Sequence, residues 1–249
     1  MLLSAVEQGT LQQRAERLGQ TTFLGGPARD FERVGNLTFQ LLLREGLKSS
    51  SRVLDVGCGA LRVGYWLMRF LEPGCYFGIE PQREVVERAL SDLIEADVME
   101  RAKAQFAYND DFDLAVFGES FDFVVARSVW THASKRQISA MMASFAATSA
   151  PGGCLLASYM PASLPAKVGR RWPLSDLVAR RLPSGHLPTV LRDYQGDSWC
   201  GVDHRRSKGG TASHHMHWIR QEAAAHRLQI RQLPYGVVNR QYWLRARLG

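Results

Sequence analysis

Between residues 52 and 159, short apolar segments alternate with longer amphipathic ones, and this alternation limits the fold more than any other feature. Short apolar runs between turn residues predict strands, whereas an apolar period near 3.6 residues predicts helices. The expected strands are residues 52–56, 75–79, 104–107, 121–126 and 153–159, and the expected helices are residues 61–71, 83–96 and 135–149. Strands and helices in strict alternation predict an α/β fold with a doubly wound, Rossmann-like parallel sheet.

Further segments flank this core on both sides. We expect helices at residues 4–18 and 31–45, the second capped by Asp30, so that residues 1–50 form an N-terminal helical segment. Near the other end, Thr211 or Ser213 can cap a helix that runs to about residue 226, followed by strands at 228–233 and 241–246. Residues 51–249 would then form one domain.

Residues 161–210 interrupt the alternation. They hold half of the chain's ten prolines and show no clear period. A long aperiodic stretch inside a compact domain is usually a functional loop. We therefore expect an insertion at about 161–210 that acts as a lid over the substrate.

Positive charge is concentrated toward the C-terminal end of the chain. The chain has a formal net charge of +7. Residues 161–249 hold 15 basic against 5 acidic residues, so the positive charge comes from this segment. Such a bias is compatible with a solvated basic surface, an anionic substrate or a nucleic acid. No apolar run reaches the roughly 18 residues that span a bilayer, and the first ten residues lack a basic leader region. We expect a cytoplasmic protein with no membrane association.

The pattern of potential metal ligands predicts no metal site. The four cysteines have no C-x-x-C spacing, so we expect buried core residues rather than disulfides or zinc ligands. His214, His215 and His217 form a cluster, but metal-binding helices prefer histidines four positions apart. A polar start to the helix explains this cluster better.

A glycine turn follows the first expected strand. Gly57, Cys58 and Gly59 stand where a parallel sheet binds ligands, at the carboxyl end of a strand, and glycine lets the backbone approach a ligand closely. A dinucleotide fingerprint requires a third glycine at the position that Arg62 occupies. Asp55, just before the glycines, would repel a pyrophosphate but attract an ammonium group. The turn therefore favours a methionine-bearing nucleoside.

Two acidic segments follow the next two strands. Glu80, followed by Pro81, lies 23 positions beyond Gly57, the offset expected of an acid that accepts both ribose hydroxyls. After the third strand, Asp110 or Asp111 can accept from an adenine amino group, and Phe112 can pack against the ring. These residues complete a predicted nucleoside site.

Residues 52–160 resemble the core of the class I S-adenosylmethionine-dependent methyltransferases. Residues 53–59 (VLDVGCG) match the first motif of that family, residues 77–80 the second, and residues 150–153 the turn into the fifth strand. Residues 121–132, with 61–62 and 30–35, resemble a bacterial branch of the family. The resemblance implies S-adenosylmethionine as methyl donor and a seven-stranded sheet whose last strand is antiparallel, in agreement with the expected strand at 241–246.

The loop after the fourth strand borders the transferred methyl group in this topology. His132 is the best-placed general base, because a pKa near 6.5 allows proton uptake at neutral pH. Arg127 can hold an anionic acceptor, and Arg127 and Ser128 also lie where the donor is expected. Trp130 more often packs into the wall at such a position. Structural roles for His132 and Arg127, as a helix cap and an ion pair, stay open.

Several functions remain open at this point. The compact chain with one insertion favours methyl transfer to a small molecule, such as a natural product or a sugar-like metabolite. Because the C-terminal third is basic, RNA or protein remains an alternative acceptor, although the sequence pattern does not indicate a second, RNA-binding fold. A non-catalytic S-adenosylmethionine-binding protein is a third interpretation. An NAD-dependent oxidoreductase is disfavoured by Arg62.

Overall fold

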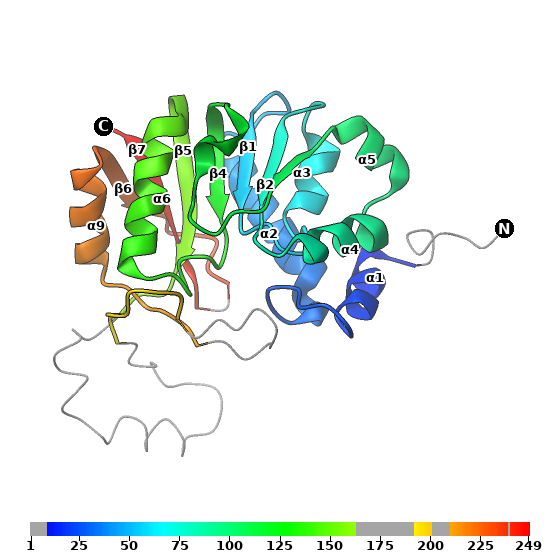
Figure 1. Ribbon diagram of the computed structural model, residues 1–249, viewed down its shortest axis with the longest axis horizontal. Helices are drawn as coiled ribbons and strands as arrows, with labels where there is room; N and C mark the ends of the chain where they lie inside the picture. Colours follow the sequence, from blue (N-terminus) through cyan, green and yellow to red (C-terminus); the bar gives the residue numbers. More distant parts are fainter. Residues whose placement is uncertain (1–8, 163–191, 201–209, 239) are drawn as a thin grey trace, which may run out of the picture.

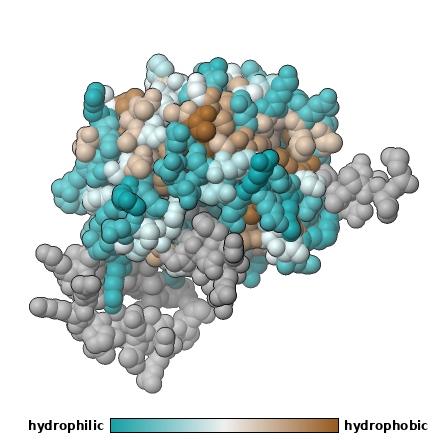
Figure 2. All heavy atoms as spheres, in the orientation of Figure 1, coloured by the Kyte–Doolittle hydropathy of each residue, from teal (hydrophilic) through white to brown (hydrophobic). Residues whose placement is uncertain are grey.

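The computed structural model describes residues 9–162, 192–200, 210–238 and 240–249 (Figure 1). Most of the insertion expected at 161–210 therefore lies outside the described residues, as do residues 4–8 of the first expected helix. No described helix is long and apolar enough to cross a membrane. On the face seen in Figure 2, hydrophilic residues predominate and apolar residues occur in small groups.

Seven strands form one mixed sheet in the order β3-β2-β1-β4-β5-β7-β6. Strands β1 to β5 are mutually parallel, and β7 runs antiparallel to both of its neighbours. The strands are β1 Val53–Val56, β2 Tyr76–Ile79, β3 Gln105–Ala107, β4 Phe121–Ala126, β5 Ser149–Tyr159, β6 Leu228–Gln232 and β7 Tyr242–Leu248. This topology confirms the predicted Rossmann-like α/β fold with an antiparallel last strand.

Helices cover both faces of the sheet and bury two separate apolar clusters. One cluster includes residues of α1 to α5, and the other includes residues of α6, α9 and the 3-10 helix η3 (Leu114–Phe117). Figure 1 shows α6 and α9 side by side in front of the sheet. The helices are α1 Leu11–Leu18, α2 Phe31–Arg44, α3 Gly64–Phe70, α4 Arg83–Leu93, α5 Ala96–Ala102, α6 Lys135–Thr148 and α9 Met216–Ala225.

Capping explains where several helices begin. Thr10 and Gln13 form a capping box, so α1 begins at Leu11. Ser134 and Gln137 form another at the start of α6. Asp30 is the N-cap residue of α2, as predicted, but its carboxylate accepts from Arg33 at 2.8 Å and not from an N–H of the first turn.

Other predicted boundaries also needed correction. The helix expected at 61–71 begins only at Gly64, because Leu61 has a left-handed backbone with φ of 58°. The helix expected at 83–96 ends at Leu93, where the extended backbone of buried Ile94 separates it from the unpredicted α5. Neither Thr211 nor Ser213 caps α9, whose N-cap residue is His215.

Helix α2 lies against the turn that leaves β1, and Gly35 permits this close approach. A Cβ atom at Gly35 would stand 2.2 Å from the carbonyl oxygen of Arg62 and 2.9 Å from the indole nitrogen of Trp66. Real Cβ atoms are not found that close to backbone oxygens, so any side chain would push α2 away. Gly35 therefore sets the distance between the N-terminal helices and the ligand-binding end of the sheet.

We expect Gly35→Ala to destabilise the protein by about 1–3 kcal/mol, the usual range for overpacking. The free-energy cost of the clash must exceed the roughly 1 kcal/mol by which alanine is more stable than glycine inside a helix. Urea unfolding measures the difference, with exposed Gln40→Ala on the same helix as the control. A Gly35→Ala protein as stable as the wild type would contradict this account of the packing.

Candidate active site

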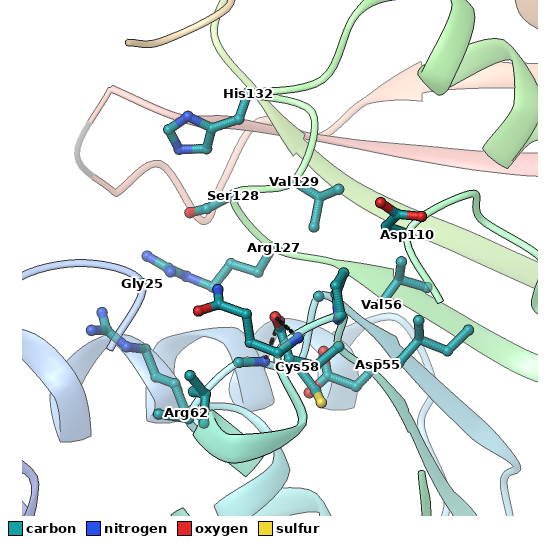
Figure 3. Close-up of a pocket in the computed structure, with 18 of the residues that line it drawn as sticks. Gly25, Asp55, Val56, Cys58, Arg62, Asp110, Arg127, Ser128, Val129 and His132 are labelled. Atoms are coloured by element: carbon teal, nitrogen blue, oxygen red, sulfur yellow. Dashed lines mark hydrogen bonds between the residues drawn. The ribbon is translucent and has the colours of Figure 1, made fainter. Parts of the chain in front are cut away.

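A pocket of about 240 Å³ opens at the carboxyl ends of β1, β2 and β4 (Figure 3). It lies where the strand order reverses around β1, the usual ligand position in an open α/β sheet. The predicted site residues that line it are Asp55, Gly57, Cys58, Gly59, Arg62, Glu80, Pro81, Asp110, Phe112, Arg127, Ser128 and His132. Asp111 does not line it, and its exposed carboxylate accepts from the backbone N–H of Asp113 at 3.1 Å.

The glycine turn closes one wall of the pocket. Gly57 and Gly59 have positive φ angles of 67° and 51°, which favour glycine. The N–H groups of Gly57 and Cys58 both donate to the carbonyl oxygen of Ile79, at 2.8 and 3.0 Å, and so tie the turn to β2. A Cβ at Gly57 would stand 2.7 Å from the side chain of Val129, so a side chain there would enter the pocket wall.

Glu80 is held rigidly at the end of β2. Its Oε2 accepts from the N–H of Gly59 at 3.2 Å, and its Oε1 accepts from the N–H of Gln82 at 3.1 Å. The side chain is almost buried yet lines the pocket. A carboxylate fixed by two backbone donors needs little reordering to accept ligand hydroxyls.

Asp55 is a buried carboxyl group at the floor of the pocket. Only 2% of the residue is exposed, and its Oδ2 accepts from the Tyr76 hydroxyl at 3.1 Å. Burial raises the pKa of Asp55 to about 7, with a further contribution from nearby Glu80, while the Tyr76 bond and Arg127 oppose the rise. A positive ligand group beside Asp55 would favour its charged form.

Cys58 is a buried residue of the pocket wall, and its thiol is unreactive. Burial, together with the negative charges of Asp55 and Glu80, raises the pKa of its thiol well above the ordinary value. The thiol therefore stays protonated and cannot act as a nucleophile at neutral pH. All four cysteines are free thiols, and no cluster of metal-ligating side chains occurs among the described residues.

The far wall pairs Phe112 with an aromatic residue from the C-terminal part of the chain. Phe112 is buried, with a left-handed φ of 61°, and its ring centroid lies 5.5 Å from that of Trp199. Trp199 belongs to residues 192–200, a described part of the predicted insertion. This segment reaches the β4 loop, where the N–H of Cys200 donates to the carbonyl oxygen of His132 at 2.6 Å.

The loop after β4 is anchored from three sides. The N–H of Ser128 donates to Ser158 Oγ on β5 at 2.7 Å, and Ser128 Oγ donates to Gln241 Oε1 at 2.9 Å. His132 Nδ1 lies 2.8 Å from the carbonyl oxygen of Gly210. Trp130 is fully buried with its indole N–H directed to the sulfur of Met141, so it packs into the wall.

Arg62 supports the entrance to the pocket. Its guanidinium donates to the carbonyl oxygen of Leu24 at 3.1 Å, with a longer contact to that of Pro27, and lies over the ring of Phe31. These contacts hold the loop at residues 23–27, which we call the strap, against the turn after β1. Arg62 thus connects the N-terminal segment to the pocket.

Sequence reasoning missed several pocket residues because they come from distant segments or lack a distinctive residue type. They are Phe23, Leu24, Gly25, Gln82, Val85, Val129 and Trp199. The Gly25-Gly26-Pro27 turn was the one signal for the strap, but a turn motif does not say which surface it faces. Trp199 stood out only as one aromatic residue among many in the basic third.

Comparison with known proteins identifies the family. A family model described as a methyltransferase domain matches residues 31–229. The chain belongs to this methyltransferase family. It is a class I enzyme, and its methyl donor is S-adenosylmethionine.

Solved methyltransferase structures share this fold, and one curated relative matches part of the chain. The magnesium protoporphyrin IX methyltransferase of Synechocystis PCC 6803, crystallised with S-adenosylhomocysteine, is 18% identical with a TM-score of 0.57, and the match covers 94% of this chain and 92% of that one. The glycopeptide N-methyltransferase MtfA is 17% identical with the same TM-score, covering 87% and 90%. An uncharacterized methyltransferase of Schizosaccharomyces pombe is 26% identical over 89 residues, so the match spans 34% of this chain and about a third of that relative.

The raised pKa of Asp55 makes the stability of the ligand-free methyltransferase depend on pH. Between the ordinary value of 3.8 and about 7, the unfolded chain loses the Asp55 proton while the folded protein retains it. Rising pH therefore favours unfolding across this window, by at most roughly 4 kcal/mol for this residue. Below the window, both states are protonated and the effect vanishes.

We expect Asp55→Asn to stabilise the ligand-free protein at pH 8 and to have little effect near pH 4, because an amide has no charge to bury. Urea unfolding at both pH values measures the change, with exposed Asp111→Asn as the control. An equal effect of Asp55→Asn at both pH values would show that the buried carboxyl does not cause the pH dependence of stability.

Proposed function

We propose that this methyltransferase transfers the methyl group to a small-molecule acceptor, such as a natural product or a sugar-like metabolite. The observation that carries the proposal is the form of the pocket: about 240 Å³, bordered by the strap on one side and by Trp199 on the other. A pocket bordered in this way on both sides suits small ligands better than a polymer. Phe23, of which 46% is exposed, adds an apolar contact at the entrance.

The donor would bind along the ends of β1 to β3. Glu80 would accept from the ribose hydroxyls, Asp110 from the adenine amino group, and Phe112 would pack against the adenine ring. Asp55 would attract the ammonium group, directly or through water. The bends at Gly57, Cys58, Gly59 and Pro81 would shape the wall, with Arg62, Arg127 and Ser128 at the methionine end. When bound, S-adenosylmethionine supplies an electrophilic methyl group for in-line displacement.

His132 is proposed as the general base for a hydroxyl acceptor. The Gly210 carbonyl beside Nδ1 can only accept a hydrogen bond, so Nδ1 carries the hydrogen in the neutral ring. Nε2 then holds the lone pair that can take a proton. The bond to Gly210 also orients the ring, as a partner on the second nitrogen does for other catalytic histidines.

The insertion at about 161–210 is proposed as the lid of a single domain that spans residues 51–249. Its described residues support this role, because Trp199 lines the pocket and Cys200 is bonded to the His132 backbone. Two structural neighbours are named for acceptors that are not nucleic acids, a magnesium porphyrin and a glycopeptide. We also propose that the protein belongs to the bacterial branch of the family that residues 121–132, with 61–62 and 30–35, resemble.

Isotope labelling tests the class of acceptor. The protein is incubated with methyl-labelled S-adenosylmethionine and a cell extract, and acid precipitation separates macromolecules from small molecules. The proposal expects label in the soluble fraction. Label confined to precipitated RNA or protein would exclude a small-molecule acceptor and favour the basic C-terminal third as a docking surface.

We expect Glu80→Gln to weaken binding of S-adenosylhomocysteine at least tenfold, because a neutral amide accepts less strongly from two hydroxyls and charged hydrogen bonds contribute roughly 1.5–3 kcal/mol. Calorimetry measures the affinity. Glu84→Gln, which alters an exposed carboxylate on α4, is the matched control. If the affinity of the Glu80→Gln protein equals that of the wild type, Glu80 does not hold the ribose.

For His132→Gln we expect a loss of soluble label of about 100-fold, within the usual range for a general base, with unchanged affinity for S-adenosylhomocysteine. His226→Gln, outside the pocket, serves as the control. An unaffected labelling rate would rule out proton transfer through His132.

A further inference from the structure

Two described segments of the C-terminal third lie against the loop after β4. They are residues 192–200 and 210–215, which Figure 1 shows below α6 and α9. The first segment is bonded to the carbonyl oxygen of His132, as described above. In the second, the N–H of Ala212 donates to the carbonyl oxygen of Thr131 at 2.6 Å. Both segments are therefore attached to the backbone of the loop that borders the pocket.

Asp193 is the charged centre of this attachment. Its Oδ2 accepts from Lys135 Nζ at 2.6 Å and from Gln195 Nε2 at 2.7 Å, and its Oδ1 accepts from the N–H of His215 at 3.2 Å. Lys135 is the first residue of α6, and His215 is the N-cap residue of α9. One carboxylate thus joins the first segment to the starts of two helices.

The Asp193–Lys135 ion pair lies among aromatic rings. Only 10% of the Asp193 side chain is exposed, and Lys135 Nζ lies 5.3 Å from the ring centroid of Trp218. Fully buried His214 packs between Trp218 and Tyr194, with ring centroids at 5.6 and 6.4 Å. A buried ion pair adds little net stability but can restrict a segment to one arrangement, because any other arrangement leaves a charge without its partner.

The position of Trp199 follows from this arrangement. Trp199 is six residues beyond Asp193, and the Tyr194 hydroxyl donates to the carbonyl oxygen of Ser198 at 3.1 Å, which closes the turn between them. At the end of that turn, the Trp199 ring lies 5.5 Å from the ring of Phe112 on the pocket wall. Asp193 itself does not line the pocket, so any effect of its carboxylate on binding must pass through the residues that it holds.

We infer that Asp193 is a positioning residue for the methyl donor. Its carboxylate holds residues 192–200 so that Trp199 stands beside Phe112 and packs against the adenine end of the bound nucleoside. The inference rests on the proposed function for the placement of adenine at Phe112. Donor binding would then depend on a segment that lies far outside the glycine turn and its acidic partners.

A double-mutant cycle of Asp193→Asn and Trp199→Ala tests the inference. Calorimetry compares S-adenosylhomocysteine with 5′-methylthioadenosine, which lacks the amino-acid end, for each single variant and for the double variant. Asp193→Glu keeps the charge, and Asp197→Asn, an exposed carboxylate on the same segment, is the matched control. Unfolding midpoints are measured alongside. If Asp193→Asn does not fold, Lys135→Gln takes its place in the cycle, because it removes the same ion pair from the side of α6.

We expect Asp193→Asn and Trp199→Ala each to weaken binding of both nucleosides about fivefold, the usual order for the loss of an aromatic contact. The double variant should bind as weakly as the weaker single variant and no worse, because Asp193 acts through Trp199. Asp193→Glu should recover part of the affinity, and Asp197→Asn should bind as the wild type does.

Unchanged affinity of Asp193→Asn together with a lowered midpoint would overturn the inference, since Asp193 would then only stabilise the fold. Losses that add in the double variant would also overturn it, because Asp193 and Trp199 would then act independently. So would weaker binding of S-adenosylhomocysteine alone, which would place the effect at the amino-acid end. If wild-type label appears only in macromolecules, the proposed acceptor fails, but the nucleoside affinities still decide the role of Asp193.

Discussion

The whole binding site depends on the pairing of β1 with β2 on one side and β4 on the other. Because the chain leaves β1 and β2 toward one half of the sheet and β4 toward the other, the loops after these strands diverge and leave a pocket between them. The glycine turn can then bond to Ile79 on β2 while Gly57 touches Val129 beyond β4. Central position in a parallel sheet thus brings together residues that are far apart in sequence.

Packing of the N-terminal helices extends this arrangement. Gly35 lets α2 touch the backbone of Arg62, and Arg62 in turn holds the strap over the pocket entrance. The chain before β1 is therefore part of the site, rather than a separate appendage. From the opposite side, Trp199 and Gly210 reach the pocket wall and His132. Segments from both ends of the chain enclose a floor that the sheet provides.

Charged groups in the pocket are arranged for ligands rather than for the stability of the empty protein. Burial raises the pKa of Asp55 to about 7, and burial together with the charge of Arg62 lowers the pKa of Arg127 to about 9. These positions lower the folding stability of the free enzyme, and ligand binding can recover that free energy. The same holds at many functional sites where a local rule of folding is violated.

The sequence by itself determined the sheet and the family and predicted many of the residues that line the pocket, because these depend on local patterns. Apolar periods mark strands and helices, and the carboxyl ends of parallel strands must meet at one edge, so Gly57 and Glu80 could be placed together in advance. Helix boundaries such as Gly64 and Met216 were less accurate, since they follow from tertiary contacts and backbone turns. Only the tertiary structure decided that Phe23 and Trp199 line the pocket, that Arg62 holds the strap, and that Asp55 is buried. These properties arise from packing between distant segments, which no local pattern records.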